Sequence, residues 1–390
     1  MAFRKLTLAI GRDGQYSHNA TCTPRRCLLW KLSFPAPSIL VTLVTAFRHS
    51  FTTPRTMTRI LVFGAGAVGA VYVYTFIQAG AEVTAVCRSN YEAVKRDGFM
   101  MYSVRFGDVR FRPSVVRVAE EAAPSGPWDF VVICSKCLPG SSPSLSNTIK
   151  PVVGPSTAIV LIQNGINIEE EVAASYPNNP IISCVVYLPC TQIRPGVIDY
   201  GATLKETLNL LELGTYPALA PEFHKRATEQ IADLIEKGGG EVKVYDDIQP
   251  QRWAKLVVNA SWNPITALSL CSDADFLRSS PGAVDLVRNV MLEVVALARA
   301  LNIEGIDEDL AELHLNRHRA RTVGKEPSML TDVREGRPFE IEAIVGNTVR
   351  LAKEHGVKVP LLDALYALAK GLYEAGERSR LAPPVLANGA

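Results

Sequence analysis

The chain has 390 residues, of which 47% are hydrophobic and 21% are charged, a composition typical of a soluble globular protein of about two domains. No run approaches the ~20 uninterrupted apolar residues of a membrane-spanning helix, so no membrane segment is predicted. Residues 1–56 contain eight Lys or Arg and one acid, whereas the remainder has 33 basic and 38 acidic residues. This mildly acidic body gives no electrostatic reason to expect a nucleic-acid partner.

Residues 1–56 form a basic N-terminal extension that is rich in Ser and Thr. These are features of an organelle transit peptide. The same segment also fits a disordered tail, or an upstream extension of a gene model whose true start is Met57. We therefore expect a cytoplasmic protein, or a mitochondrial one if the extension is a transit peptide, and the start at Met1 or Met57 stays open.

Eight cysteines are scattered along the chain, and no secretory signal is evident. Free thiols in a reducing compartment are the expected state. Cys134 and Cys137 form a CxxC pair, but no second Cys or His pair completes a zinc set. The sequence therefore predicts no metal site.

The first half of the chain alternates between strands and helices. Residues 59–63 form a short apolar strand, residues 67–79 a helix that Gly80 ends, and residues 81–87 a second strand. Together they have the size of one βαβ unit. Further strands are predicted at 129–134, 158–163, 181–187 and 241–245, with a more antiparallel section at 196–213 and a helix at 221–237.

From Asp247 onward the pattern is helical, and no strand is predicted. The expected fold is α/β, with an N-terminal Rossmann domain at residues 57–246 and an all-helical C-terminal domain at residues 247–378. Residues 379–390 are expected to form a frayed tail. The predicted helices cover about 249–270, 281–301, 307–321, 327–335, 338–355 and 360–376.

A G-x-G-x-x-G motif joins the first strand to the first helix. Alone such a motif is a weak signal, but here it follows a strand and opens a helix within a βαβ unit. Gly64 permits the tight turn, Gly66 lets the backbone approach a pyrophosphate, and Gly69 lets the helix pack against the strand. The helix N-terminus offers unpaired N–H groups to the anion. The predicted cofactor-binding loop is Gly64, Ala65, Gly66, Ala67, Val68 and Gly69.

The end of the second strand indicates which dinucleotide binds. NAD sites usually place Asp or Glu there to accept from the ribose 2′-hydroxyl. This sequence has Arg88 at that place, and Glu82 lies at the opposite end of the strand. A cation suits a 2′-phosphate, so NADPH is the predicted cofactor. The alternative for Arg88 is a solvated arginine without a ligand.

Polar residues follow two further strands at their carboxyl ends, where open α/β sheets bind ligands. Lys136 follows one strand, and Gln163, Asn164 and Gly165 follow another. A lysine there can bind phosphate or carboxylate, and an amide can hold the nicotinamide ribose or carboxamide. Each is also an ordinary loop residue, so this pattern alone leaves both interpretations open.

Lys255, Asn259 and Asn263 recur every four residues and so share one face of a predicted helix. These three residues form a polar stripe along the helix. Burying the stripe without hydrogen-bond partners costs free energy, so it suits a polar cleft. A partly desolvated lysine there has a lowered pKa and can give up a proton near neutral pH. The alternative is a solvent-exposed helix face that stops at Asn263-Pro264.

A second polar cluster lies farther along the chain. Ser328 and Asp332 share a face of a short helix that Gly336 ends. Pro338 fits the first position of the next helix, which places Glu340 in its first turn. Taken alone, Glu340 is best explained by its interaction with the helix dipole.

In this order, these motifs resemble the ketopantoate reductase family over residues 58–376. The most specific parts are Lys255-Leu-Val-Val-Asn259 with Asn263-Pro264, and Ser328-Met-Leu with Glu340 twelve residues later.

The resemblance implies a Rossmann domain, a helical domain and catalysis in the cleft between them. It also implies that Lys255 is the general acid that protonates the developing alkoxide. The other implied roles are substrate binding or lysine orientation for Asn259 and Asn263, substrate contact for Ser328 and Glu340, and cofactor contact for Lys136 and Asn164.

The implied activity is NADPH-dependent reduction of 2-dehydropantoate to (R)-pantoate in pantothenate biosynthesis. One position departs from the family, which often has Asn where this chain has Lys325. That departure keeps open the reduction of another 2-keto acid or a secondary-metabolite ketone. A third interpretation is a non-catalytic NADP-binding redox sensor, against which the stripe from Lys255 argues. The expected partner is a small 2-keto acid, with no nucleic acid and no membrane, and a homodimer is left open.

Overall fold

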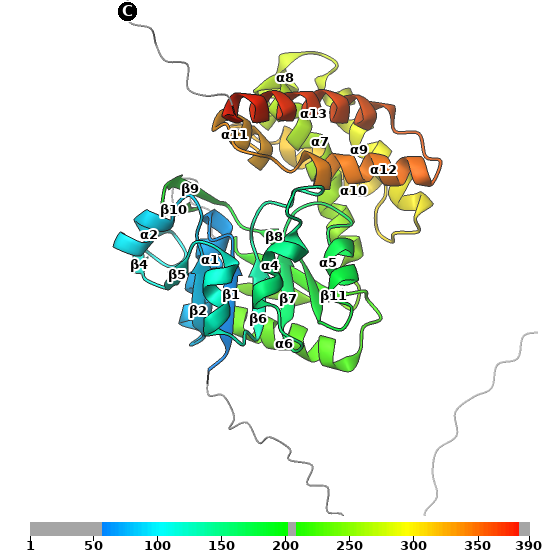
Figure 1. The fold of residues 1–390 in the computed structure, drawn as a ribbon. Helices are drawn as coiled ribbons and strands as arrows, with labels where there is room; N and C mark the ends of the chain where they lie inside the picture. Colours follow the sequence, from blue (N-terminus) through cyan, green and yellow to red (C-terminus); the bar gives the residue numbers. More distant parts are fainter. Residues whose placement is uncertain (1–56, 202–207, 382–390) are drawn as a thin grey trace, which may run out of the picture. The chain divides into compact units, whose positions relative to one another are not determined.

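The computed structural model describes residues 57–201 and 208–381 (Figure 1). All described residues belong to one compact unit, Pro54–Ala390. The predicted basic extension, residues 1–56, lies outside the described residues, and with it the expectations about compartment and start.

An eight-stranded sheet is the centre of the N-terminal half. Its strands are β1 (Arg59–Phe63), β2 (Glu82–Val86), β5 (Ser114–Val116), β6 (Phe130–Ile133), β7 (Ala158–Ile162), β8 (Ile181–Tyr187), β11 (Leu210–Tyr216) and β12 (Glu241–Val244). They lie in the order β12-β11-β8-β7-β6-β1-β2-β5. The strands from β8 to β5 are parallel, whereas β11 runs antiparallel to β8 and carries β12 parallel to itself.

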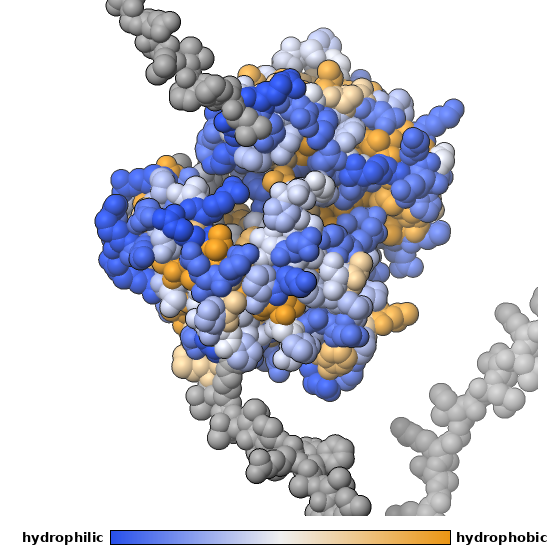
Figure 2. Space-filling view, in the orientation of Figure 1, coloured by the Kyte–Doolittle hydropathy of each residue, from blue (hydrophilic) through white to orange (hydrophobic). Residues whose placement is uncertain are grey.

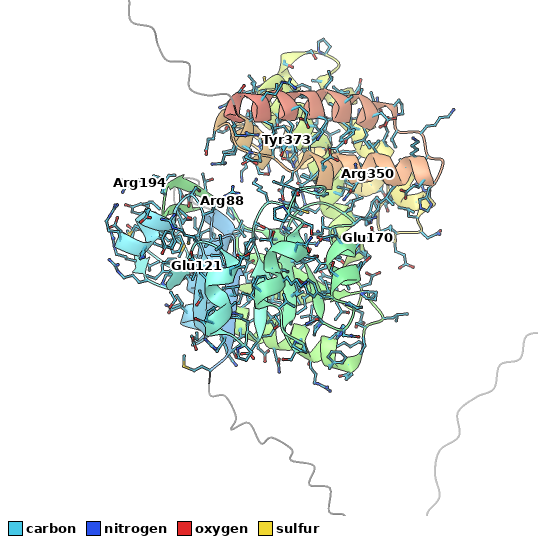
Figure 3. All side chains as sticks on the ribbon, in the orientation of Figure 1. Arg88, Glu121, Glu170, Arg194, Arg350 and Tyr373 are labelled. Atoms are coloured by element: carbon cyan, nitrogen blue, oxygen red, sulfur yellow. The ribbon has the colours of Figure 1, made fainter. Side chains whose placement is uncertain are left out.

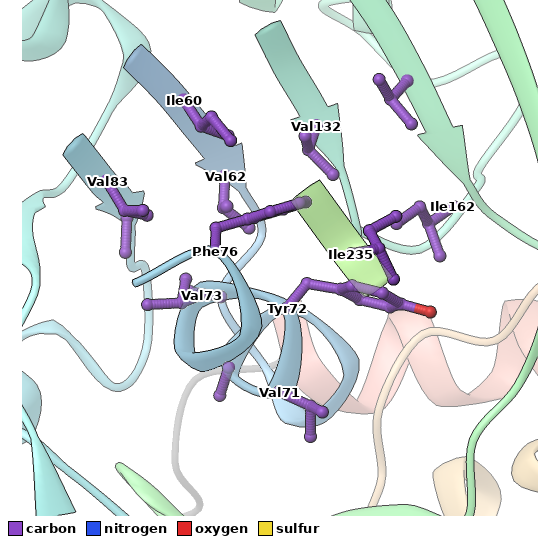
Figure 4. Close-up of a cluster of buried hydrophobic side chains, with 14 of the residues drawn as sticks. Ile60, Val62, Val71, Tyr72, Val73, Phe76, Val83, Val132, Ile162 and Ile235 are labelled. Carbon is purple, nitrogen blue, oxygen red and sulfur yellow. The ribbon is translucent and has the colours of Figure 1, made fainter. Parts of the chain in front are cut away.

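Helices cover both faces of this sheet, because successive residues of a buried strand point to opposite sides. In β1, Ile60 and Val62 pack against Tyr72 and Phe76 (Figure 4), whereas Leu61 joins a second apolar cluster on the other face. The first face is covered by α1 (Ala67–Gln78) and α6 (Glu222–Lys237), and the second by α3 (Ala119–Ala122), α4 (Leu145–Ile149), η2 (Lys150–Val152) and α5 (Glu170–Ser175).

A four-stranded sheet lies beside this core and was only partly predicted. It contains β3 (Phe99–Ser103), β4 (Val109–Phe111), β9 (Cys190–Arg194) and β10 (Val197–Tyr200), in the order β4-β3-β10-β9. Of this sheet, the predicted antiparallel section at 196–213 contains β10, and the prediction missed β3, β4 and β9. It also missed the main-sheet strand β5, the helices α2 (Tyr91–Asp97), α3, α4 and α5, and the turns η1 (Ala123–Ser125) and η2. The joining of the two halves of this sheet could not be predicted, because β3 pairs with β10, far along the chain, and no local pattern marks that pairing.

After β12 the described chain is helical, which confirms the predicted fold class of a Rossmann domain followed by an all-helical domain. The prediction missed α8, and residues 338–340 precede the next helix instead of opening it. The last helix continues to Leu381, into the predicted tail. The elements are α7 (Gln249–Ser269), α8 (Asp273–Ser279), α9 (Ala283–Ala300), α10 (Glu308–Arg319), α11 (Ser328–Arg334), the π-helical turn η3 (Glu342–Gly346), α12 (Asn347–Glu354) and α13 (Pro360–Leu381).

The surface is mixed, with hydrophilic residues predominating on the face in Figure 2 and apolar residues scattered among them. Leu219 and Val323 are among the most exposed apolar side chains, and they belong to separate loops. Within the described residues, no helix is long and apolar enough to cross a membrane.

Candidate active site

The turns after β1, β2, β6 and β7 meet at one edge of the main sheet. These strands are neighbours and run parallel, so their carboxyl ends lie together. The edge therefore brings together the glycine loop, Arg88, Lys136 and Asn164, four features that were predicted separately. Open α/β sheets bind their ligands at such an edge.

The glycine loop has the geometry that a pyrophosphate needs. Gly64 has φ +91°, and a Cβ on it would lie 2.5 Å from the backbone nitrogen of Ser135. A Cβ on Gly69 would lie 2.4 Å from the carbonyl oxygen of Gly64, so α1 packs directly on the turn. A Cβ on Gly66 would meet nothing within 4 Å, and no side chain caps the N-terminus of α1. This open space in front of uncapped N–H groups fits a dinucleotide phosphate.

Arg88 lies just after β2 and is exposed (Figure 3). Its guanidinium forms no hydrogen bond or ion pair with any residue in the described ranges. Two residues on, the buried Asn90 donates from Nδ2 to the carbonyl oxygen of Ala65 at 2.8 Å and to Oε1 of Gln192 at 3.0 Å. These bonds hold the Arg88 loop against the glycine loop. The arrangement suits a 2′-phosphate, and the NADPH preference stays a prediction.

Lys255 projects from α7 towards the sheet edge. Its Nζ donates to Oδ1 of Asn164 at 3.0 Å and to the carbonyl oxygen of Val186 at 2.5 Å, and it lies 5.2 Å from the ring centroid of Tyr187. The pocket around it is lined by Gln163, Asn164, Gly165 and Val185 from the sheet side and by Arg252, Leu256 and Asn259 from α7.

Burial, together with the positive charge of Arg252, lowers the pKa of Lys255 to about 8. The carboxylates of Glu340 and Glu212 act against this shift and raise the pKa. The ammonium group is therefore a proton donor with a pKa close to physiological pH, the range in which general acids are effective.

Glu340 is buried, with an exposed fraction of 5%, and it links the two domains. Its Oε1 accepts from the N–H of Cys137 at 2.9 Å, and its Oε2 accepts from Nδ2 of Asn164 at 3.1 Å. The predicted place in the first turn of a helix is wrong. Glu340 precedes Ile341, where the helix starts, and its carboxylate binds across the domain boundary instead of facing its own helix.

Lys136 has partners from the helical domain. Its Nζ donates to Oδ2 of Asp332 at 2.5 Å and lies 4.0 Å from Oε2 of Glu340. Asp332 is almost fully buried and also accepts from Nε of Arg337 at 3.1 Å. Lys136 therefore neutralises buried carboxylates here, and its predicted contact with the cofactor stays a prediction.

The other predicted substrate residues lie along the same helix and beyond it. Asn259 is half-buried and lines the pocket one turn after Lys255. Asn263 is buried, and its Oδ1 accepts from the N–H of Met329 at 3.3 Å, which holds the start of α11 against α7. Ser328 is exposed beside that contact. The alternative that the helix stops at Asn263-Pro264 is wrong, because α7 continues to Ser269.

Arg252, one turn before Lys255, is a residue that the sequence reasoning missed. Its guanidinium is 3.1 Å from Oε1 of Glu169, and both side chains are almost fully buried. It also donates to Ser183 Oγ at 2.6 Å and to the carbonyl oxygens of Gln163, Gly165 and Cys184. Its place on the lysine face of α7 was visible in the sequence, but its partners on three loops and strands were not.

Comparisons with known proteins agree with this architecture. The family model described as "Ketopantoate reductase PanE/ApbA" matches residues 60–211, and the one described as "Ketopantoate reductase PanE/ApbA C terminal" matches residues 247–373. A 2-dehydropantoate 2-reductase from Nostoc sp. is 30% identical over 318 residues, which cover 80% of this chain and 94% of the relative.

Solved structures give the same result. The 2-dehydropantoate 2-reductase from Methylococcus capsulatus is 35% identical, with a TM-score of 0.70 over 82% of this chain and 97% of its own. A D-mandelate dehydrogenase in complex with NADH and anilino(oxo)acetate, 21% identical with a TM-score of 0.71 over 82% and 99%, shares the fold. The chain belongs to the ketopantoate reductase family, whose members are oxidoreductases that use a nicotinamide cofactor.

Proposed function

We propose that this protein reduces 2-dehydropantoate to (R)-pantoate with NADPH. The observation that carries the proposal is the chain of hydrogen bonds from Lys255 through Asn164 to Glu340, at the sheet edge where a dinucleotide would bind. It puts a buried proton donor, an amide and a carboxylate in one pocket. The similarity to 2-dehydropantoate 2-reductases supports the choice of substrate.

The residues of the chain supply orientation and a proton. NADPH, when bound at the glycine loop, supplies the hydride. Lys255 holds a proton at Nζ and donates it to the oxygen of the keto group as negative charge develops there. Asn164 accepts from that Nζ and so fixes its direction, while Glu340 fixes the amide of Asn164. Asn259 lies one turn along α7, where it can bind the substrate.

Lys255→Ala tests the mechanism. The variant should lose about 10²- to 10⁴-fold in kcat, the usual contribution of a general acid, and should bind NADPH with nearly unchanged affinity. Lys237→Ala is the matched control, because that lysine is exposed at the end of α6 and should be dispensable. NADPH absorbance gives the rate and fluorescence titration gives the affinity. Turnover by Lys255→Ala equal to that of the control would contradict the role.

A second substrate class is favoured by Lys325. Burial lowers the pKa of Lys325, and its N–H donates to Oδ1 of the buried Asp273 at 2.7 Å, so its loop is fixed just before α11. The family often has Asn at this position, and a lysine in its place would favour a 2-keto acid with an additional acidic group. Two measurements separate this substrate class from 2-dehydropantoate. One is kcat/KM on a panel of branched and dicarboxylic 2-keto acids, and the other is growth of a pantothenate auxotroph that expresses residues 57–390. Highest kcat/KM on another keto acid, and no growth, would overturn 2-dehydropantoate as the substrate.

A further inference from the structure

Glu212 is a buried carboxylate in β11 that no step above uses. Its exposed fraction is 8%, and it lies directly opposite Val185 of β8. Opposite residues of an antiparallel pair project to the same face of the sheet. Val185 lines the pocket of Lys255, and Tyr187, two residues along β8, shares that face. Glu212 therefore faces the pocket side.

The neighbours of Glu212 in β11 confirm this direction. Leu211 and Leu213 belong to the apolar cluster under α1 and α6, on the opposite face of the sheet. On the pocket side, Oε1 of Glu212 accepts from the hydroxyl of Tyr245 at 2.9 Å. A buried carboxylate is costly without a compensating charge. Lys243 of β12 lies opposite Glu212 but is exposed, and Lys255 is the cation in the pocket whose charge Glu212 favours.

Four charged or titratable groups act on Lys255 from the elements around it. Arg252 of α7 disfavours its positive charge, and Glu340, from the loop before η3, favours it. Glu212 of β11 favours it as well, and Tyr187 of β8 presents its ring to the ammonium. Burial and Glu212 raise the pKa of Tyr187, so this phenol stays neutral and adds no charge of its own. Glu212 is thus one of two carboxylates that oppose Arg252.

We propose that Glu212 is a positioning residue whose negative charge keeps Lys255 in the ammonium form that proton donation requires. This deepens the proposed reduction and rests on it for the role of Lys255. Glu212 acts at a distance, through the charge it places behind β8. In its absence, Glu340 would be the remaining carboxylate that favours the charge of Lys255, and the lysine would lose its proton at lower pH.

The test measures the protonation of Lys255 directly. The full-length protein and its Glu212→Gln variant are labelled with trace acetic anhydride across a pH series, and acetylation of Lys255 is read by peptide mass spectrometry. Because only the neutral amine reacts, the midpoint of labelling reports its titration. The variant midpoint should fall by roughly half to one pH unit, as expected for loss of one nearby charge in a partly buried site.

Activity gives an independent second reading. The Glu212→Gln variant should reduce the substrate as fast as the wild type at pH 6 and about fivefold more slowly at pH 8.5. A purely structural defect would lower the rate at both pH values. Glu212→Asp retains the charge and should restore most of the pH profile. Glu212→Met, a second neutral variant, should repeat the shift seen with glutamine.

Glu241→Gln is the matched control, because this glutamate lies on the neighbouring strand β12 but is exposed and paired with Arg105. It should leave the labelling midpoint unchanged. An unchanged midpoint in both neutral Glu212 variants overturns the proposal. If no keto acid is reduced even by the wild type, the proposed function fails, and the labelling midpoints still decide whether Glu212 sets the charge of Lys255.

Discussion

Replacing Arg252 by methionine should destabilise the protein strongly, because it leaves the carboxylate of Glu169 buried without its cation. Both side chains are almost fully buried, and their closest approach is 3.1 Å. Glu169 has two other hydrogen-bond donors, Ser183 Oγ at 2.5 Å and Gln249 Nε2 at 3.4 Å, and neither brings a positive charge. The methionine would fill similar volume but neutralise nothing.

The magnitude follows from this geometry. Removing one partner of a buried ion pair costs about 3–5 kcal/mol. The carbonyl oxygens of Gln163, Gly165 and Cys184 would lose their bonds to Arg252 as well, which places the cost in the upper part of that range. With an unfolding entropy of about 2.1 cal/mol/K per residue over the unit Pro54–Ala390, a cost of about 4–5 kcal/mol lowers Tm by roughly 6–7 °C.

Thermal unfolding followed by circular dichroism measures the effect in Arg252→Met, Glu169→Gln and the double variant. The double variant should regain part of the loss, because a neutral amide at position 169 removes the unpaired charge. Arg299→Met is the matched control: its guanidinium pairs with Glu308 at the surface, where both side chains are more than half exposed. That pair should contribute at most about 1 kcal/mol. Equal Tm losses for Arg252→Met and Arg299→Met would refute the reasoning.

Three further predictions concern the cofactor and the proton. Gly66→Ala should retain Tm but weaken NADPH binding. Gly69→Ala should lower both Tm and NADPH affinity, because its Cβ would meet the Gly64 carbonyl. Melting curves and fluorescence titrations that are the same for the two variants would contradict the loop geometry. Arg88→Ala should weaken NADPH binding about 10- to 100-fold and NADH binding hardly at all, and an equal loss for both would exclude a 2′-phosphate contact. The rate of reduction should be flat below pH 8 and fall about tenfold per unit above it, because Lys255 donates only when protonated; a steady-state kcat profile that rises above pH 8 would contradict this.

Much of the Rossmann domain is predictable because its signals are local. A strand that ends in glycine, a helix of the right length and Gly80 at its end identify the first βαβ unit. In the structure Gly80 has φ +83° and follows Ala79, the C-cap of α1. Parallel pairing then brings Arg88, Lys136 and Asn164 to one edge, a consequence of strand order that requires no side-chain information. The stripe from Lys255 is equally local, since helical spacing alone puts its members on one face.

The contacts that give the site its chemistry are not local. Glu340 accepts a hydrogen bond from the N–H of Cys137, 203 residues earlier in the chain. Glu340 itself lies just before the helix in whose first turn the sequence analysis placed it. Arg252 pairs with Glu169, which also lies far earlier in the chain. Neither partner is marked by periodicity or by a turn signal. The sequence could therefore identify the lysine but not the groups that tune it.

Helix α7 carries two cations one turn apart, Arg252 and Lys255, and their different surroundings give them different functions. Arg252 has a buried carboxylate of its own, Glu169 at 3.1 Å, and this ion pair joins the helical domain to the sheet. Lys255 donates to the oxygens of Asn164 and Val186, and within residues 57–201 and 208–381 no carboxylate forms an ion pair with it; Glu340 and Glu212 act on it from farther away. Its proton is therefore held loosely enough to be given up. A guanidinium at position 255 would keep the positive charge but could not act as a general acid, because its proton would not leave near neutral pH.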